Sequence, residues 1–249
     1  MKISIITVCL NCESTIEDTI RSVTSQTYKS IEYILIDGRS SDNTMVIVNK
    51  YKDHIDQIVS EKDGGIYHAI NKGIKIATGE VIGILHADDF YENPEIITNV
   101  IQLFKLSGSD SVYGNLQYVS RENKNKILRN WVAGDYNRDS FKYGWMPPHP
   151  SFFVKKKAYE IYGAYSLELS LAADYEFMVR TLYKHEMSVA YLNEVLVKMR
   201  IGGKGNYSLK QRLIANREDK KAWEMNEVKP GLFTFLLKPL RKLHQFKWN

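Results

Sequence analysis

The sequence contains few of the residues that mark a disulfide-bonded or zinc-binding protein. Its 249 residues include only two cysteines, Cys9 and Cys12. No further ligands stand at the spacing that a structural zinc site needs, and a thioredoxin-like pair would open a helix, whereas Cys9 ends a predicted strand. We therefore interpret both cysteines as structural free thiols, which fit a reducing compartment.

Long apolar runs are also missing. No stretch approaches the roughly 20 apolar residues that a membrane span needs. The apolar run at residues 3–10 is short and is followed by polar Asn11 and Glu13, so residues 1–20 do not have the pattern of a signal peptide. Neither an internal repeat nor a low-complexity segment stands out. We therefore expect a cytoplasmic protein.

Acidic residues are absent from residues 238–247, which contain the four cations Lys238, Arg241, Lys242 and Lys247. The net charge of the whole chain is +5, and this basic tail predicts an anionic partner: a nucleic acid, a phospholipid or a phosphorylated substrate. No helix-turn-helix or zinc-finger pattern accompanies the tail, so we do not expect a nucleic acid.

The remaining sequence has the composition of a folded protein, with 44% apolar and 25% charged residues, and its length suits one large domain or two closely packed halves. Strands are predicted at residues 3–8, 31–36, 55–59, 81–85 and 111–119, and helices begin near residues 16, 41, 66 and 93. A capping box at residues 14–17 should open the first helix, and Asn93 should cap the last. This alternation predicts an α/β fold with a mostly parallel sheet and helices on both faces.

Ligands of such sheets bind at the carboxyl ends of the strands. The polar residues at those ends are Asn11 and Glu13, residues 37–42, residues 61–65 and residues 86–89. In residues 86–89 (His-Ala-Asp-Asp), the two adjacent acids repel each other by about 1 kcal/mol or more. A bound Mg²⁺ or Mn²⁺ would remove that cost and bridge a diphosphate. The alternative is a pair of loop or cap acids beside Pro94.

Two other strand-end segments also suit a ligand. Residues 37–42 can turn tightly at Gly38 while Asp37 accepts a base N–H or a sugar hydroxyl. Residues 63–73 place two glycines before a helix whose free N–H groups can bind an anion. Taken alone, residues 37–42 are better explained as an ordinary strand-to-helix turn, and in residues 63–73 the alternative is that Lys72 is a solvated charge and Gly73 a packing contact.

The first half of the chain, residues 1–120, is followed by two further predicted segments. Residues 121–205 should form an acceptor-side half, with a strand at 151–154, a helix at 175–185 and a strand at 189–199. Residues 206–249 should form a C-terminal tail that begins with a charged helix and ends with basic and aromatic residues.

The order of these motifs resembles the family 2 glycosyltransferases with the GT-A fold, of the type found in bacterial polysaccharide biosynthesis. The resemblance covers roughly residues 1–205, and it depends on the whole set because each motif alone is unspecific. The residues that carry it are Thr7, residues 11–13, residues 37–44, residues 71–73, Gly79 and residues 86–89.

The resemblance implies a donor site in the first half of the chain. Thr7, Glu13 and Asp37 would hold the nucleoside of a nucleotide sugar. Asp63 and Lys72 belong to the same donor-binding set.

The acidic motif implies a metal. Asp88 and Asp89 correspond to the residues that bind Mn²⁺ or Mg²⁺ and the diphosphate, with the metal chiefly on Asp89 and Asp88 nearer the sugar or ribose. Many members have an acid where this chain has His86, so the role of that first acid is open here.

The second half would supply the catalytic base. The segment around Asp174 resembles the family's acidic motif at a helix start, although Ala173 replaces the usual Glu, and a helix cap is the alternative role. His149 is expected beside the diphosphate or the acceptor, or in a structural role. Arg200 and Lys204 stand in a Gly-rich loop that resembles one closing over the diphosphate.

The resemblance implies inversion, in which Asp174 takes the proton of an acceptor hydroxyl. A UDP-sugar is favoured as donor, with a GDP-sugar as the alternative, and the acceptor would be a glycan or a lipid-linked glycan. Two other classes stay open. A degenerate sugar-binding or scaffold protein would explain His86 and Ala173 in the place of acids, and a nucleotidyltransferase should have glycines in residues 10–13, which have none.

The tail at residues 231–248 mixes large apolar and basic residues. It is too short and too charged to cross a bilayer, and we expect it to lie in the interface of an anionic membrane. This would place the protein peripherally on the inner face of the plasma membrane, near a lipid-carried acceptor. A helix packed on the domain, or a dimer contact, is the alternative.

Overall fold

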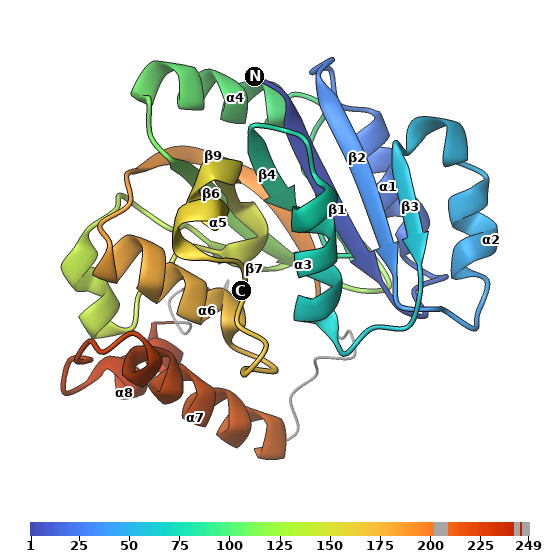
Figure 1. The fold of residues 1–249 in the computed structure, drawn as a ribbon. Helices are drawn as coiled ribbons and strands as arrows, with labels where there is room; N and C mark the ends of the chain where they lie inside the picture. Colours follow the sequence, from blue (N-terminus) through green and yellow to red (C-terminus); the bar gives the residue numbers. More distant parts are fainter. Residues whose placement is uncertain (202–208, 242–244, 246–249) are drawn as a thin grey trace.

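The computed structural model describes residues 1–201, 209–241 and 245. One curled sheet of nine strands forms the centre of this part of the chain, in the order β3-β2-β1-β4-β8-β6-β9-β5 with β7 beside β6 (Figure 1). The strands are β1 (Ile3–Cys9), β2 (Ile31–Asp37), β3 (Gln57–Ser60), β4 (Val81–Ile84), β5 (Asp89–Tyr91), β6 (Ser111–Val119), β7 (Ile127–Trp131), β8 (Phe152–Lys155) and β9 (Val189–Arg200).

The direction of the strands changes across the sheet. β1, β2, β3 and β4 are parallel, as the sequence predicts, and β6 is parallel to β9. β8 is antiparallel to both of its neighbours, β4 and β6. β5 is antiparallel to β9, and β7 is antiparallel to β6. The α/β prediction is confirmed, but the sheet as a whole is mixed rather than mostly parallel. A short run of buried apolar residues can form a strand beside a parallel or an antiparallel neighbour, so the run alone does not determine the direction of the strand.

Helices cover both faces of the sheet, as predicted. They are α1 (Ile16–Thr24), α2 (Thr44–Asn49), α3 (Ile66–Ile76), α4 (Ile96–Ser107), α5 (Lys156–Tyr162), α6 (Ala173–Met178), α7 (Leu209–Met225) and α8 (Thr234–Leu240). Side chains alternate between the two faces of the sheet along β1. Ile3 and Ile5 lie in the core beneath α1, α2 and α4. Ile6 and Val8 lie in the core on the other face, beneath α3, α5 and α6. Each fully buried side chain of this kind contributes about 1.5–3 kcal/mol.

Two predicted helix starts differ in detail. Thr15 precedes α1 but makes no side-chain capping bond, and its hydroxyl instead approaches the Cys12 carbonyl oxygen at 3.4 Å. α4 begins at Ile96 rather than at Pro94. Asn93 forms a turn of its own, in which its side chain accepts a hydrogen bond from the Glu95 amide at 2.8 Å.

Two elements, one in each half of the chain, were not predicted as such from the sequence. Asp89 opens the short strand β5, which pairs with the end of β9. The predicted helix at 175–185 begins earlier, as α6, and continues as a π-helix, η4 (Val179–Lys184). Three 3₁₀ turns complete the described secondary structure: η1 (Lys52–His54), η2 (Arg138–Tyr143) and η3 (His149–Ser151).

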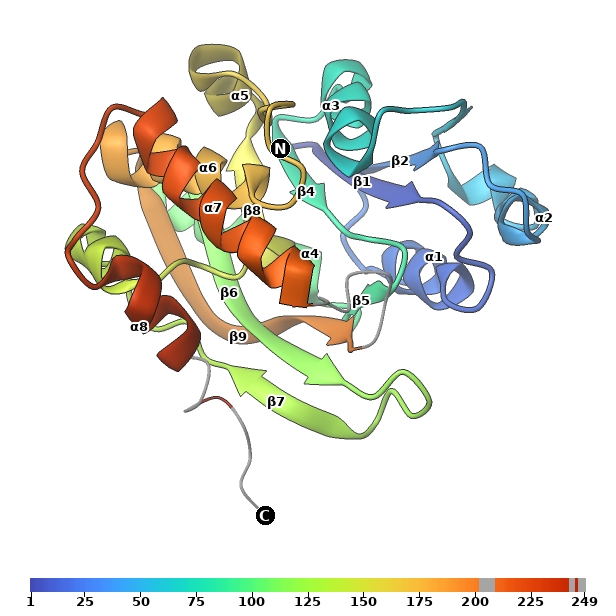
Figure 2. The same cartoon turned by 90° about the horizontal axis from the view of Figure 1, so that it is seen from below.

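The C-terminal helices pack on the second half (Figure 2). Trp223 of α7 is fully buried, and its indole N–H donates to the Tyr175 hydroxyl at 2.8 Å. In α8, the Thr234 hydroxyl donates to the Lys142 carbonyl oxygen at 2.6 Å. α8 therefore packs on the domain along one side. Across residues 1–201, 209–241 and 245, no helix combines the length and the apolar character that a bilayer crossing requires.

Candidate active site

Asp37 organises the loops at the carboxyl ends of β1, β2 and β3. Its fully buried carboxylate accepts hydrogen bonds from the Ser40 hydroxyl at 2.5 Å, the Ser60 hydroxyl at 2.6 Å and the Cys9 thiol at 3.6 Å. Burial raises the pKa of the Cys9 thiol far above its usual value, and the negative Asp37 raises it further. Cys9 is thus a neutral donor in the core, and neither Cys9 nor Cys12 forms a disulfide, which agrees with their predicted structural role.

The loop after β1 is joined to the loop after β2. Glu13 is exposed, and its carboxylate accepts from the backbone and the side-chain amide of Asn43, both at 2.9 Å. Asn11 accepts from the Ser41 amide at 2.8 Å. Thr7 lies below these loops, fully buried, and its hydroxyl accepts a hydrogen bond from Tyr33 at 3.2 Å. Glu13 therefore lies at the open edge of the sheet, whereas Thr7 braces the strand beneath it.

The segment before α3 reaches the same edge. Asp63 accepts from the Gly65 amide at 2.9 Å, and Gly65 has a φ of 125°, which only glycine adopts without strain. A Cβ atom on Gly38 would lie 2.9 Å from the Asp63 carboxylate, so the loops that follow β2 and β3 lie against each other. Lys72 forms an ion pair with Glu61 at 2.9 Å. The residues predicted to bind the donor thus gather at one edge, with Lys72 already paired.

Asp89 has an environment that fits a cation. Its side chain is fully buried, and neither carboxylate oxygen has a hydrogen-bond partner among the described residues. Burial and the adjacent Asp88 raise the pKa of Asp89 well above its usual value, and the positive Arg200 only partly opposes this. An unpaired buried carboxylate is costly, so a divalent cation shared with Asp88 would satisfy the site.

The cation would need other ligands as well. No group of three His, Cys, Asp or Glu side chains within residues 1–201, 209–241 and 245 could hold a metal by itself. This arrangement suits Mg²⁺ or Mn²⁺, which commonly bind to one or two carboxylates together with substrate phosphates.

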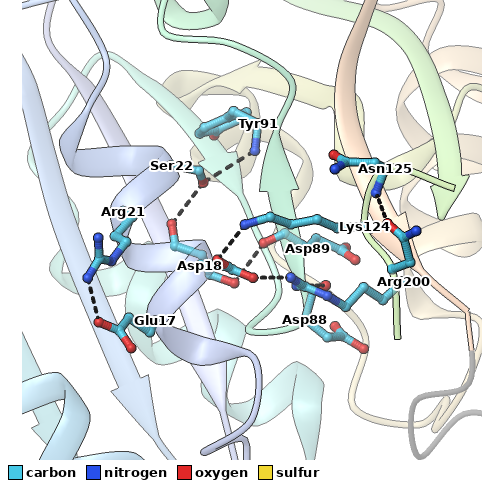
Figure 3. Close-up of polar contacts among 12 residues, drawn as sticks. Glu17, Asp18, Arg21, Ser22, Asp88, Asp89, Tyr91, Lys124, Asn125 and Arg200 are labelled. Carbon is cyan, nitrogen blue, oxygen red and sulfur yellow. Dashed lines mark hydrogen bonds and ion pairs between the residues drawn. The ribbon is translucent and has the colours of Figure 1, made fainter. Parts of the chain in front are cut away.

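Arg200 connects residues 86–89, here called the acidic segment, to helix α1 (Figure 3). It is buried, forms an ion pair with Asp18 of α1 and donates to the Asp88 carbonyl oxygen at 3.0 Å. Asp18 also pairs with Lys124 at 2.8 Å. Burial would raise the pKa of Asp18, but the hydrogen bond from Lys124 and the charge of Arg200 lower it below its usual value.

The position of Arg200 bears on its predicted role. The sequence predicts that Arg200 binds the diphosphate. In the structure, its guanidinium pairs with the Asp18 carboxylate and donates to the Asp88 carbonyl oxygen. It lies over the Phe90 ring at 4.8 Å, beneath the acidic segment. Lys204, its predicted partner in the Gly-rich loop, lies outside the described residues.

Asp174 is held by two side chains from distant parts of the chain. The Tyr67 hydroxyl, from α3, donates to one carboxylate oxygen at 3.0 Å, and His149 Nδ1 lies 3.1 Å from the other. Asp174 is 17% exposed, so it is accessible although it is held on both sides. It lies within the first turn of α6, where the helix dipole favours a negative charge.

Two histidines in contact link the acidic segment to Asp174: His86 belongs to the segment, and His149 lies beside Asp174. The His86 and His149 rings are 5.6 Å apart, centre to centre. Burial lowers the pKa of His86 to about 4, and the nearby His149 adds to this effect. His86 is therefore a neutral ring near pH 7, between the predicted metal residues and the predicted base.

Two contacts that the sequence did not reveal hold the chain that leads into α6. Glu218 of α7 accepts from the amides of Ser170, Leu171 and Ala172, at 3.0, 2.7 and 3.0 Å. Asn71 of α3 pairs with both backbone groups of Tyr165, at 2.8 and 3.1 Å. Asn71 belongs to residues 71–73, one of the motifs that carry the family resemblance. Glu218 could not be predicted from its neighbours in the sequence, because its partners lie almost fifty positions away.

Comparison with known proteins shows similarity to named glycosyltransferases. A PGL/p-HBAD biosynthesis glycosyltransferase of Mycobacterium bovis BCG is 28% identical over 208 residues, covering 82% of this chain and 78% of the relative. An E. coli enzyme named UDP-Glc:alpha-D-GlcNAc-diphosphoundecaprenol beta-1,3-glucosyltransferase is 40% identical over 101 residues, which cover 39% of each chain.

Solved structures share the fold. The Staphylococcus aureus protein TarS, residues 1–349 in complex with UDP-GlcNAc, has a TM-score of 0.69 at 18% identity, covering 92% of this chain and 68% of TarS. The mannosyltransferase PcManGT of Pyrobaculum calidifontis, solved with GDP-Man and Mn²⁺, has a TM-score of 0.69 at 17% identity, covering 98% and 70%. These likenesses confirm the GT-A fold that the sequence predicts.

The family model for "Glycosyl transferase family 2" matches residues 4–162, more than half of the chain. The match spans the strand-end loops, the acidic segment and His149, and it stops before Asp174. The nucleotidyltransferase and scaffold alternatives are not supported, because the relatives are named glycosyltransferases. The protein is a glycosyltransferase, and it belongs to glycosyl transferase family 2.

Proposed function

We propose that this enzyme transfers a sugar from a UDP-sugar, with inversion, to a hydroxyl group of a lipid-linked glycan. The observation that carries the proposal is the arrangement of Asp174. Its carboxylate is accessible, is fixed by Tyr67 and His149, and lies next to the acidic segment through the His86–His149 contact.

The proposed reaction is a single displacement. The acceptor oxygen attacks the anomeric carbon from the face opposite the nucleotide, the bond from that carbon to the phosphate oxygen breaks, and UDP leaves. Asp174 takes the proton of the acceptor hydroxyl as the new bond forms. Tyr67 and His149 hold the Asp174 carboxylate in one orientation, so its remaining lone pairs are already directed for taking the proton of the acceptor hydroxyl. Inversion can be tested by determining the anomeric configuration of the product, which should be opposite to that of the donor.

Asp89 and Asp88 are the proposed metal residues. A bound Mn²⁺ or Mg²⁺ would neutralise charge on the departing diphosphate. Arg200 holds the Asp88 carbonyl oxygen and places positive charge near Asp89, so the protein keeps the two acids in position before the donor arrives. Glu13, Asp37 and Asp63 stand at the strand ends where the nucleoside would bind.

The choice of donor and acceptor draws on the relatives. TarS is solved with UDP-GlcNAc, and the E. coli relative is named for UDP-Glc and a diphosphoundecaprenol-linked acceptor. PcManGT, solved with GDP-Man and Mn²⁺, keeps a GDP-sugar as the alternative donor. A lipid-linked acceptor would place the enzyme on the inner face of the plasma membrane.

The donor site can be tested by thermal unfolding with UDP or GDP, each with and without Mn²⁺. A diphosphate at about 100 times its dissociation constant should stabilise the protein by about 2.7 kcal/mol. We expect this stabilisation with UDP, only when Mn²⁺ is present, and not in Asp89→Asn. The control Asp139→Asn removes an exposed carboxylate that pairs with Lys142 of η2, and it should respond like the wild type. Metal-dependent stabilisation that persists in Asp89→Asn would contradict the assignment.

A further inference from the structure

α8 and the residue pair before it carry a cluster of exposed apolar side chains. Leu232 is 90% exposed, Phe233 55%, Leu236 65% and Leu240 50%. Single exposed apolar residues are normal on a protein surface, but four within nine positions of one segment form a patch, which usually marks a binding surface.

The orientation of α8 is fixed from its other side. Lys238 pairs with Asp219 of α7 at 2.7 Å and lies 3.5 Å from the centre of the Tyr175 ring. Thr234, one turn earlier, is fully buried. Phe233, Leu236 and Leu240 follow at spacings of three and four, so they share the opposite face of the helix. The apolar face therefore points away from the domain while the inner face holds the helix in place.

The charge of the segment indicates what covers this face. Residues 228–249 contain five Lys or Arg residues and no Asp or Glu. Lys229 and Arg241, on either side of the patch, are exposed. A second copy of the chain would place the same patch on itself across a two-fold axis, which brings like charges together. An anionic bilayer surface instead accepts the apolar side chains and attracts the basic ones.

The position of α8 also fits a membrane-borne substrate. In Figure 1, α7 and α8 lie on the side of the molecule toward which β1 and β2 point, and Figure 2 views the molecule from that side. The carboxyl ends of these strands carry the donor-site loops. A bilayer that contacts α8 would therefore lie on the same side as the proposed site.

We propose that the exposed apolar patch of Leu232, Phe233, Leu236 and Leu240, on α8 and the two residues before it, inserts into the interface of an anionic lipid bilayer. The choice of a bilayer as the occupant rests on the proposed function, because a lipid-linked acceptor brings the enzyme to a membrane. The binding itself needs no sugar transfer, so it can be measured separately.

The test is sedimentation of the full chain with vesicles of phosphatidylcholine alone or mixed with phosphatidylglycerol. We expect binding only to the mixed vesicles, weakened by salt, and weakened at least about tenfold in Leu236→Glu/Leu240→Glu. The matched control, Leu106→Glu/Ile161→Glu, places two charges at exposed positions on α4 and α5, 85% and 60% exposed, and should bind like the wild type. Thermal unfolding of both variants would confirm that they fold.

Equal binding by wild type and the α8 variant, or no binding by the wild type, would overturn the proposal. A concentration-dependent dimer in light scattering that the α8 variant loses would assign the face to a second copy instead. Transfer to a water-soluble acceptor should be the same in the wild type and the α8 variant. If the wild type binds vesicles but transfers no sugar, the proposed function fails and the docking surface stands.

Discussion

At the scale of single residues, Tyr67 is the most informative contact that the sequence did not reveal. Its hydroxyl donates to Asp174 from 107 positions away, and it stacks on Tyr165 with ring centres 5.8 Å apart. Asp174 and Asp89 could be predicted because they belong to ordered motifs. Tyr67 could not, because a hydroxyl that orients a carboxylate has no local pattern until α3 and α6 are brought together.

Tyr67→Phe tests this contact. Losing one hydrogen bond to a charged group costs about 1.5–3 kcal/mol, so we expect kcat to fall by about 10- to 100-fold. The KM for the donor should stay unchanged, because the lost bond is to the base and not to the nucleotide. Steady-state kinetics would measure both values. Tyr28→Phe makes the same chemical change where the hydroxyl donates to the Met1 carbonyl oxygen, and it should leave kcat unchanged. A fall in both variants would refute a role specific to Asp174.

At the scale of elements, the site depends on how helices far apart in sequence hold each other. The sequence predicted most helices and strands from periodicity, since apolar spacing depends only on nearby residues. It did not predict that β8 runs antiparallel, that Asp89 opens a strand, or that α7 closes over the segment before Asp174. These features depend on pairings between distant segments.

Glu218→Ala tests the link between α7 and α6. It removes the acceptor of three backbone amides just before Asp174, and we expect a loss of about 1.5–3 kcal/mol in the free energy of unfolding. Transfer should fall as well, because the first turn of α6 loses its support. Denaturant unfolding would measure the change. Glu224→Ala, on the same helix with only a 3.8 Å pair to Lys220, should be neutral. Wild-type stability in Glu218→Ala would show that α7 does not brace the site.

At the scale of the whole molecule, the edge of the sheet opposite the site carries a different polar cluster. Glu32 accepts from the Ser4 hydroxyl at 2.5 Å, the Thr78 hydroxyl at 2.6 Å and Lys2 at 3.1 Å. Burial would raise the pKa of Glu32, but these hydrogen bonds outweigh it and lower the pKa from 4.5 to about 2. The cluster joins β1 and β2 to the end of α3 without contacting the site.

Glu32 should therefore make stability depend on pH. Because its pKa is lower in the folded state, its contribution is complete above about pH 4.5 and is lost as the pH falls towards about 2. Glu32→Gln should lower stability at pH 7 by on the order of 2 kcal/mol and flatten the profile over that acidic range. Thermal unfolding at a series of pH values would show this. An unchanged acid profile in the variant would contradict the assignment.

The central claim is that Asp174 takes the proton of the acceptor while other residues bind the donor. The most direct test compares Asp174→Asn with the wild type in two measurements, the rate of sugar transfer and the affinity for UDP with Mn²⁺. We predict a loss of transfer of about 10²–10⁴-fold and an unchanged affinity, because a general base acts only in the chemical step. Wild-type transfer, or a loss of UDP affinity as large as the loss of transfer, would contradict the claim.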